Sequence, residues 1–175
     1  MNRRNLKTLF ALLFIGATNL QARDFKHPGS LLSMHEINTI KNHVANQDSV
    51  FYDEWKSFLS DYRCSTTWKA RNPTSDVGGT DGTRQRCSED AVSARYNAIV
   101  WQVTGQTDHA DAAVKTLMGW CNVIKTANNQ LYQYPCRDMI FAAEMLRNSD
   151  GTFYSGWAQA DIDKFLTINT LLIIT

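Results

Sequence analysis

The stretch SEDAVSARYNAIVWQVTGQTDHADAAVKTLMGWCNVIK, residues 88–125, decides the fold of this chain. Ser88 is a typical N-cap residue, and Glu89 and Asp90 follow it where acidic side chains favour the positive end of a helix. Apolar residues then recur at close to the helical period on both sides of Gly105, which supplies a left-handed stop between two helices. The stretch therefore predicts an antiparallel helical hairpin.

The two expected helices each carry one apolar stripe, and Thr107 is the expected cap of the second helix. The stripes consist of Ala91, Ala94, Ala98, Val100, Trp101 and Val103 in the first helix and of Ala110, Ala113, Val114, Leu117, Met118, Trp120 and Cys121 in the second. Each stripe marks the face of its helix that we expect to be buried.

The same periodicity predicts further helices on both sides of the hairpin. A Ser33–Glu36 capping box begins a helix that runs to about Asn46. The other expected helices cover about 50–62, 137–147 and 157–168. The two helices that precede the hairpin show no period-two alternation typical of a strand. The sequence therefore predicts an all-α domain.

The first 22 residues have the order of a secretory signal peptide: three cationic residues, a short apolar run and a small residue at the expected cleavage site. The apolar run is too short to span a bilayer, so we expect export to the periplasm or the cell exterior and no stable membrane span after cleavage. The alternative is an uncleaved anchor. The mature part, 23–175, has 15 cationic and 17 acidic residues, a length typical of one domain, and no basic character that would favour nucleic acid.

Four cysteines in an exported chain favour two structural disulfides, for which three pairings exist. Cys64 and Cys87 flank one long polar loop, and Cys121 and Cys136 flank a connection between helices, so we expect these two local pairings. Neither a Cys-x-x-Cys nor a His-x-x-x-His spacing occurs, so the sequence predicts no metal site.

The loop 63–86 has no helical period and contains Pro73 and several glycines, and loops of this length in compact domains are often functional. Its five cationic residues exceed its two acids, which favours an anionic ligand. The candidate ligand-binding residues of the loop are Lys69, Arg71, Arg84 and Arg86. The alternative is that they are ordinary solvated charges.

Several short sequence motifs, taken in their order along the chain, resemble the N-terminal part of the alginate-lyase-type domain of secreted polysaccharide lyases. These motifs are His27-Pro28-Gly29, the Gly-rich loop, Asp90-Ala91, Trp101 with Thr104-Gly105, Ala110-Asp111, Trp120 and Ala142–Arg147. They cover nearly all of the mature chain but only about the first half of the family domain.

The resemblance implies an incomplete (α/α) toroid of antiparallel helical hairpins, cut short in this chain. It also implies β-elimination at a uronic acid of an anionic polysaccharide of the alginate or glucuronan type, without a cofactor. Tyr134 and Arg137 match the wall of the family's cleft and join the candidate binding residues. The family's catalytic Asn-His pair, Tyr and Arg lie in later helices, so catalytic residues stay unassigned here; the dipeptide Asn42-His43 lies at a different place in the fold.

Two other functions fit the same sequence. One is a non-catalytic secreted module that binds carbohydrate or another partner, and the other is a disulfide-tied exported helical protein without a glycan role. Trp68 and Trp157 are candidates for stacking on sugar rings. Glu144 lies in an apolar helix, where a buried structural carboxylate and a cleft residue are both compatible with the pattern.

Overall fold

The computed structural model describes residues 25–77, 82–125 and 133–174, and within these ranges every regular element is a helix. The elements are α2 (Met34–Ala45), α3 (Ser49–Leu59), the 3-10 helix η1 (Tyr62–Cys64), α4 (Thr83–Thr104), α5 (Thr107–Cys121), α6 (Gln133–Met145) and α7 (Gln159–Ile174). The predicted all-α class is confirmed. The predicted signal segment lies outside the described residues.

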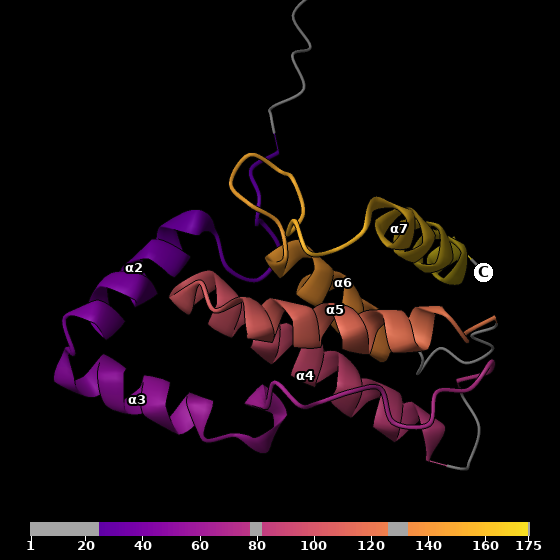
Figure 1. Cartoon of the computed structure of the whole chain (residues 1–175), viewed down its shortest axis with the longest axis horizontal. Coiled ribbons are helices and arrows are strands. Elements are labelled where there is room, and N and C mark those ends of the chain that lie inside the picture. The colour runs from indigo at the N-terminus through magenta and orange to yellow at the C-terminus, as the bar shows by residue number, and fades with distance from the viewer. Residues whose placement is uncertain (1–24, 78–81, 126–132, 175) are drawn as a thin grey trace, which may run out of the picture.

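Helix α4 is the central element of the fold. It packs against α5 and α6, while the α2–α3 hairpin lies at one end and α7 rests on α5 and α6 (Figure 1). Arg95 of α4 pairs with Asp138 of α6 at 2.9 Å, and the Gln102 side chain donates to the Met145 carbonyl at 2.8 Å. These two contacts have the same sequence offset, so α4 and α6 run parallel and begin toward the same end of the molecule.

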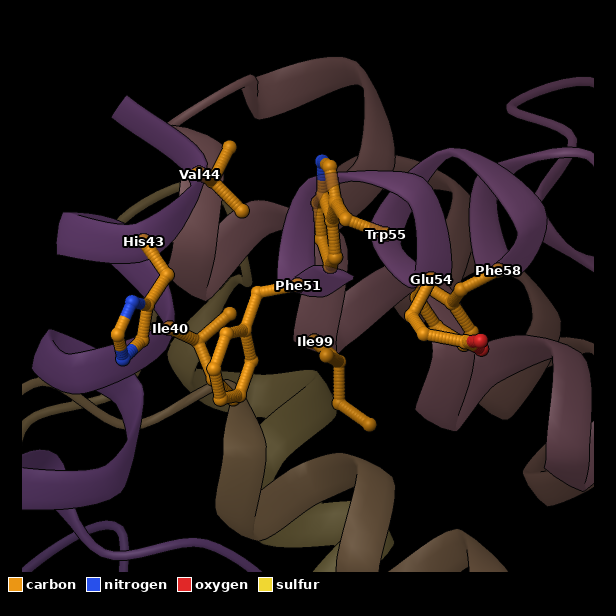
Figure 2. Close-up of a pocket in the computed structure, with 8 residues that line it drawn as sticks. All are labelled: Ile40, His43, Val44, Phe51, Glu54, Trp55, Phe58 and Ile99. Atoms are coloured by element: carbon orange, nitrogen blue, oxygen red, sulfur yellow. The ribbon is translucent and has the colours of Figure 1, made fainter. Parts of the chain in front are cut away.

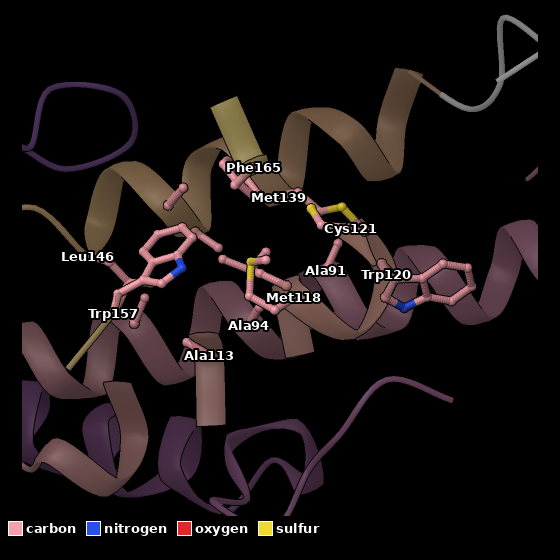
Figure 3. Close-up of a cluster of buried hydrophobic side chains, with 14 of the residues drawn as sticks. Ala91, Ala94, Ala113, Met118, Trp120, Cys121, Met139, Leu146, Trp157 and Phe165 are labelled. Carbon is pink, nitrogen blue, oxygen red and sulfur yellow. The ribbon is translucent and has the colours of Figure 1, made fainter. Parts of the chain in front are cut away.

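The core lies between α4, α5, α6 and α7 (Figure 3). Ala91, Ala94 and Ala98 of α4 and Ala110 and Ala113 of α5 are all buried. Small side chains at these positions let the two helix backbones approach closely. The predicted stripes are thus confirmed, with Trp101 and Val114 only half-buried at the edge.

Local capping signals set several helix ends. Ser33 accepts a hydrogen bond from the Glu36 backbone N–H, and the Glu36 carboxylate accepts from the Ser33 N–H at 2.7 Å, so the predicted capping box is confirmed. Gly105 ends α4 with φ of 75°, as expected. The predicted start at Ser88 is wrong: α4 begins at Thr83, after Gly82 turns the chain with φ of 79°.

The other helix boundaries differ by a few residues from the boundaries that the sequence predicted. The helix expected over 50–62 divides into α3 and η1, with Asp61 between them accepting from the Arg63 backbone N–H at 2.9 Å. Helix α6 begins at Gln133, so that Pro135 lies in its first turn, where a missing N–H costs nothing. Trp157, expected as a possible sugar platform, is buried in the core just before α7.

The predicted Cys64–Cys87 disulfide is not formed in the structure. The Arg63 carbonyl accepts from the Ser93 hydroxyl at 2.7 Å, which places η1 beside the middle of α4. Cys87 precedes Ser93 by six residues, or about 9 Å along the helix, which is farther than a disulfide spans. The Cys64 thiol instead donates to the Phe58 carbonyl at 3.2 Å.

The pairing of Cys121 with Cys136 stays a prediction. Cys121 is buried at the end of α5, and the side chain of Cys136 lies outside the described residues.

We expect Cys64 to react slowly with a thiol reagent in the native protein at pH 8. Burial raises the pKa of this thiol to about 11, so only about one thiol in a thousand is ionised at that pH. Mass-spectrometric mapping of alkylated peptides with and without urea measures the difference. A native rate close to that of free cysteine would contradict the buried thiol.

Candidate functional site

The predicted ligand-binding loop forms a strap, residues 65–77, that follows η1 and crosses α4 and α5. The strap is anchored rather than free: the Lys125 backbone N–H donates to the Ser75 carbonyl at 2.8 Å, and Val77 is fully buried in the core. Ala70 lies directly over Gly119 of α5, where a Cβ added to the glycine would lie 2.5 Å from the Ala70 Cβ. Only a glycine lets the strap come this close.

The buried carboxylate of Asp90 holds the strap to the helices. It accepts hydrogen bonds from the Trp68 indole N–H at 3.0 Å and from the Trp120 indole N–H at 2.8 Å. It also accepts from the Arg71 backbone N–H and from Arg71 Nε, both at 2.7 Å. Asp90 is completely buried, so these four donors replace the water that a carboxylate would otherwise bind.

Arg71 is one of the cations predicted to bind an anionic ligand, but its charge is already balanced. Its guanidinium contacts Asp90 and donates to Glu89 at 2.7 Å, and it lies 4.8 Å above the Trp68 ring. Burial alone would lower the pKa of Arg71, but the hydrogen bonds to Asp90 and Glu89 raise it overall. Arg71 therefore orders the strap and has little free charge for a ligand.

The remaining candidate cations lie on the strap and in the N-terminal halves of α4 and α6, and we call this group the basic end: Lys69, Arg84, Arg86 and Arg137. Lys69 and Arg84 are exposed, and Arg86 is half-buried with its guanidinium on the Thr83 hydroxyl at 2.9 Å. Arg137 is exposed and lies 3.7 Å from Asp138, which also pairs with Arg95. The side chain of Tyr134 lies outside the described residues.

Two helix N-termini add positive potential to the basic end. Arg84 lies in the first turn of α4 and Arg137 in the second turn of α6, and the two helices run parallel. Arg137 is level with the residue before Arg95, ten residues beyond Arg84, so the backbones of the two arginines lie about 15 Å apart along the axis of α4. Cations spaced in this way suit an extended polyanion better than a small anion.

The sequence did not single out Tyr62 as a surface residue. Tyr62 is 64% exposed, and its ring lies 5.6 Å from the Trp68 ring and next to the Arg63 guanidinium. A paired guanidinium and carboxylate keep this corner in place, because Arg63 donates to Asp61 through Nε and Nη2 at 2.9 and 2.6 Å. Exposed aromatic rings beside cations are suited to contact with sugars that carry carboxylates.

His109 of α5 is half-buried beside Asn97 of α4. Asn97 donates to the carbonyls of Arg63 and Ser93, both at 3.0 Å, so its side-chain oxygen is the atom that faces His109 Nδ1 at 2.7 Å. His109 Nδ1 therefore donates, and Nε2 is the proton-accepting nitrogen of the neutral ring. Burial lowers the pKa of His109, against a smaller opposing effect of Asp108. No sequence motif joins these residues, which are twelve apart.

Glu144, left open by the sequence, has a structural role. Its carboxylate accepts from His27 Nδ1 at 2.6 Å and from the Gly29 backbone N–H at 3.2 Å, and it pairs with Arg147 at 3.0 Å. These contacts fix the segment that precedes α2 against the end of α6.

The described residues contain no group of three His, Cys, Asp or Glu side chains that could hold a metal ion. In the same ranges, no helix has the length and apolar character needed to cross a membrane. Comparison of the chain with protein-family models, with curated proteins and with solved structures finds no match. The resemblance to alginate-lyase-type domains therefore stays a prediction from the sequence.

Proposed function

We propose that this chain is an exported, lyase-type helical domain that binds a uronate-containing polysaccharide at its basic end. In this proposal the α4–α5 hairpin is one repeat in the wall of an (α/α) toroid, and the strap borders the sugar-binding surface. The observation that carries the proposal is the alignment of Arg84 and Arg137 on parallel helices whose N-termini lie toward one end.

A polyuronate suits this arrangement better than a small anion does. The exposed cations are spread along the surface instead of converging on one point, and a polyuronate carries a carboxylate on every sugar. Lys69 on the strap and Tyr62 of η1 are also exposed. Because these charges are exposed, the binding would weaken as the salt concentration rises.

Two functions are compatible with this proposal: a polysaccharide lyase, which would cleave the bound polymer, and a non-catalytic module, which would only bind it. For lyase chemistry, His109 would be a candidate general base, because its neutral imidazole has a fixed proton-accepting nitrogen, although it lies beside Asn97, thirteen residues beyond Arg84 on α4. The non-catalytic binding module is favoured by the pairing of Arg63 with Asp61 and of Arg71 with Asp90. Because these two arginines, which lie beside the rings of Tyr62 and Trp68, are already neutralised, they have little charge left to stabilise a reacting carboxylate. We place binding first and leave the catalytic residues unassigned.

We expect the double variant Arg84→Ala, Arg137→Ala to bind alginate or glucuronan about tenfold more weakly than the wild type. An exposed ion pair is worth up to about 1 kcal/mol, so the loss of two accounts for this change. Affinity electrophoresis or titration calorimetry at two salt concentrations measures it, and the wild type should lose more affinity to salt than the variant.

The matched control is Lys41→Ala, Lys56→Ala, which removes two cations from the α2–α3 hairpin at the other end of the molecule (Figure 1). Equal loss in both double variants would show a non-specific charge effect and would contradict the basic end as the site. Ultraviolet absorbance of unsaturated uronates then separates the two functions: product that disappears in His109→Gln supports a lyase, and binding without product supports the non-catalytic module.

A further inference from the structure

A second site lies far from the basic end, in the angle between α2 and α3. A pocket of about 270 Å³ opens there, with Ile99 of α4 at its base. In Figure 2, Phe51 and His43 lie to one side, Glu54 and Phe58 to the other, and Ile99 between them. The size is at the small end of the range of ligand pockets and fits one small headgroup.

The walls of this pocket are largely aromatic. Trp55 and Phe58 of α3 have ring centroids 5.5 Å apart and tilted, and Phe51 stacks on the His43 imidazole at 4.0 Å. Phe51 is 55% exposed, so a ligand can reach its ring without opening the fold. The face of an aromatic ring carries partial negative charge, so a cation is attracted to any ring face that borders the pocket.

Glu54 gives the pocket a negative charge. It is exposed at the pocket lip and has no hydrogen-bond or ion-pair partner in the described part of the chain. Its neighbour on the helix, Asp53, is instead paired with Lys56 at 2.7 Å and does not line the pocket. On the opposite side the His43 imidazole contacts the Asp48 carboxylate at 2.6 Å.

Aromatic rings and an unpaired carboxylate together recognise a particular class of cation. A primary ammonium is strongly hydrated and needs several acceptors, but this pocket offers one carboxylate. A quaternary or fully N-methylated ammonium has no N–H to satisfy, is apolar at its surface, and gains cation–π attraction from each ring. We propose that the α2–α3 pocket binds a quaternary or N-methylated ammonium group, with Phe51, Trp55 and Phe58 as the cage and Glu54 as the counter-charge.

The test uses choline and its neutral isostere 3,3-dimethylbutan-1-ol as probes on the whole protein. We expect choline to bind with a change in Trp55 fluorescence or in its indole NMR signal, and the neutral isostere to bind at least about fivefold more weakly. Equal affinities for the two probes would show a merely apolar pocket and would overturn the proposal, as would the absence of choline binding.

Two surface variants locate the site. Glu54→Gln should weaken choline binding about fivefold and leave the neutral isostere unaffected, and Phe51→Leu, which keeps an apolar side chain without a π face, should do the same. Asp53→Asn is the control and should bind choline like the wild type. A dimer in sedimentation that Phe51→Leu dissociates would make this face an interface between copies of the chain, and the proposal would then be wrong.

Discussion

Replacing Asp90 with alanine is expected to destabilise the protein by about 3–5 kcal/mol, the cost of removing one partner from a buried charged pair. The carboxylate accepts from two indole N–H groups and twice from Arg71, and Trp120 is fully buried. In the variant the Trp120 indole N–H loses its acceptor where water does not replace it. Urea unfolding followed by tryptophan fluorescence measures the loss.

The neighbouring residue Glu89 provides the control. It makes one ion pair with Arg71 and is about a third exposed, so Glu89→Gln should cost less than about 1 kcal/mol. Release of the strap should also make the bonds after Lys69 and Arg71 accessible to trypsin in Asp90→Ala. A loss below about 1 kcal/mol in Asp90→Ala, with unchanged proteolysis, would show that the strap is held by other contacts.

Replacing Gly119 with valine is expected to cost about 2–3 kcal/mol, because the new side chain occupies the space of Ala70. The first carbon alone would lie 2.5 Å from the Ala70 Cβ, so either the strap or α5 has to move. Thermal or urea unfolding measures the change. The cost outweighs the gain in helix propensity that follows when a glycine inside a helix is replaced.

A double-mutant cycle tests whether the strap causes this cost. Adding Ala70→Gly to Gly119→Val should recover about half of the lost stability, since it removes the atom that clashes. Lys115→Val is the control for a β-branched residue at an exposed position of α5, and its effect should be within about 0.5 kcal/mol. If the changes in stability caused by Gly119→Val and Ala70→Gly are additive, the destabilisation by Gly119→Val does not come from its contact with Ala70.

The sequence predicted the candidate site only in part. Local composition identified the strap region and its excess of cations, and Lys69, Arg84 and Arg137 are indeed exposed. Arg71 was also predicted to bind a ligand, because a count of charges does not distinguish a guanidinium that is paired with acids from one that is exposed. Its acidic partners are 18 and 19 residues away, and only the packing of the strap on α4 brings them together.

The pocket between α2 and α3 could likewise be predicted from the sequence only in part. The sequence predicted helices in both of these segments, and Phe51, Trp55 and Phe58 lie at helical spacing in the second of them. Periodicity shows that these rings share one face of a helix, but not whether a partner helix covers that face. The angle between α2 and α3, with Ile99 at its base, leaves part of it open.

What the sequence by itself determined is the local structure: helices in order, the Ser33–Glu36 capping box, and the hairpin that turns at Gly105. These features depend on hydrogen bonds and apolar spacing within a few residues, so neighbouring residues encode them. The tertiary structure alone decided which charges are neutralised and which remain free. Charge pairing depends on distances of a few ångströms between segments far apart in the chain, as between Arg71 and Asp90.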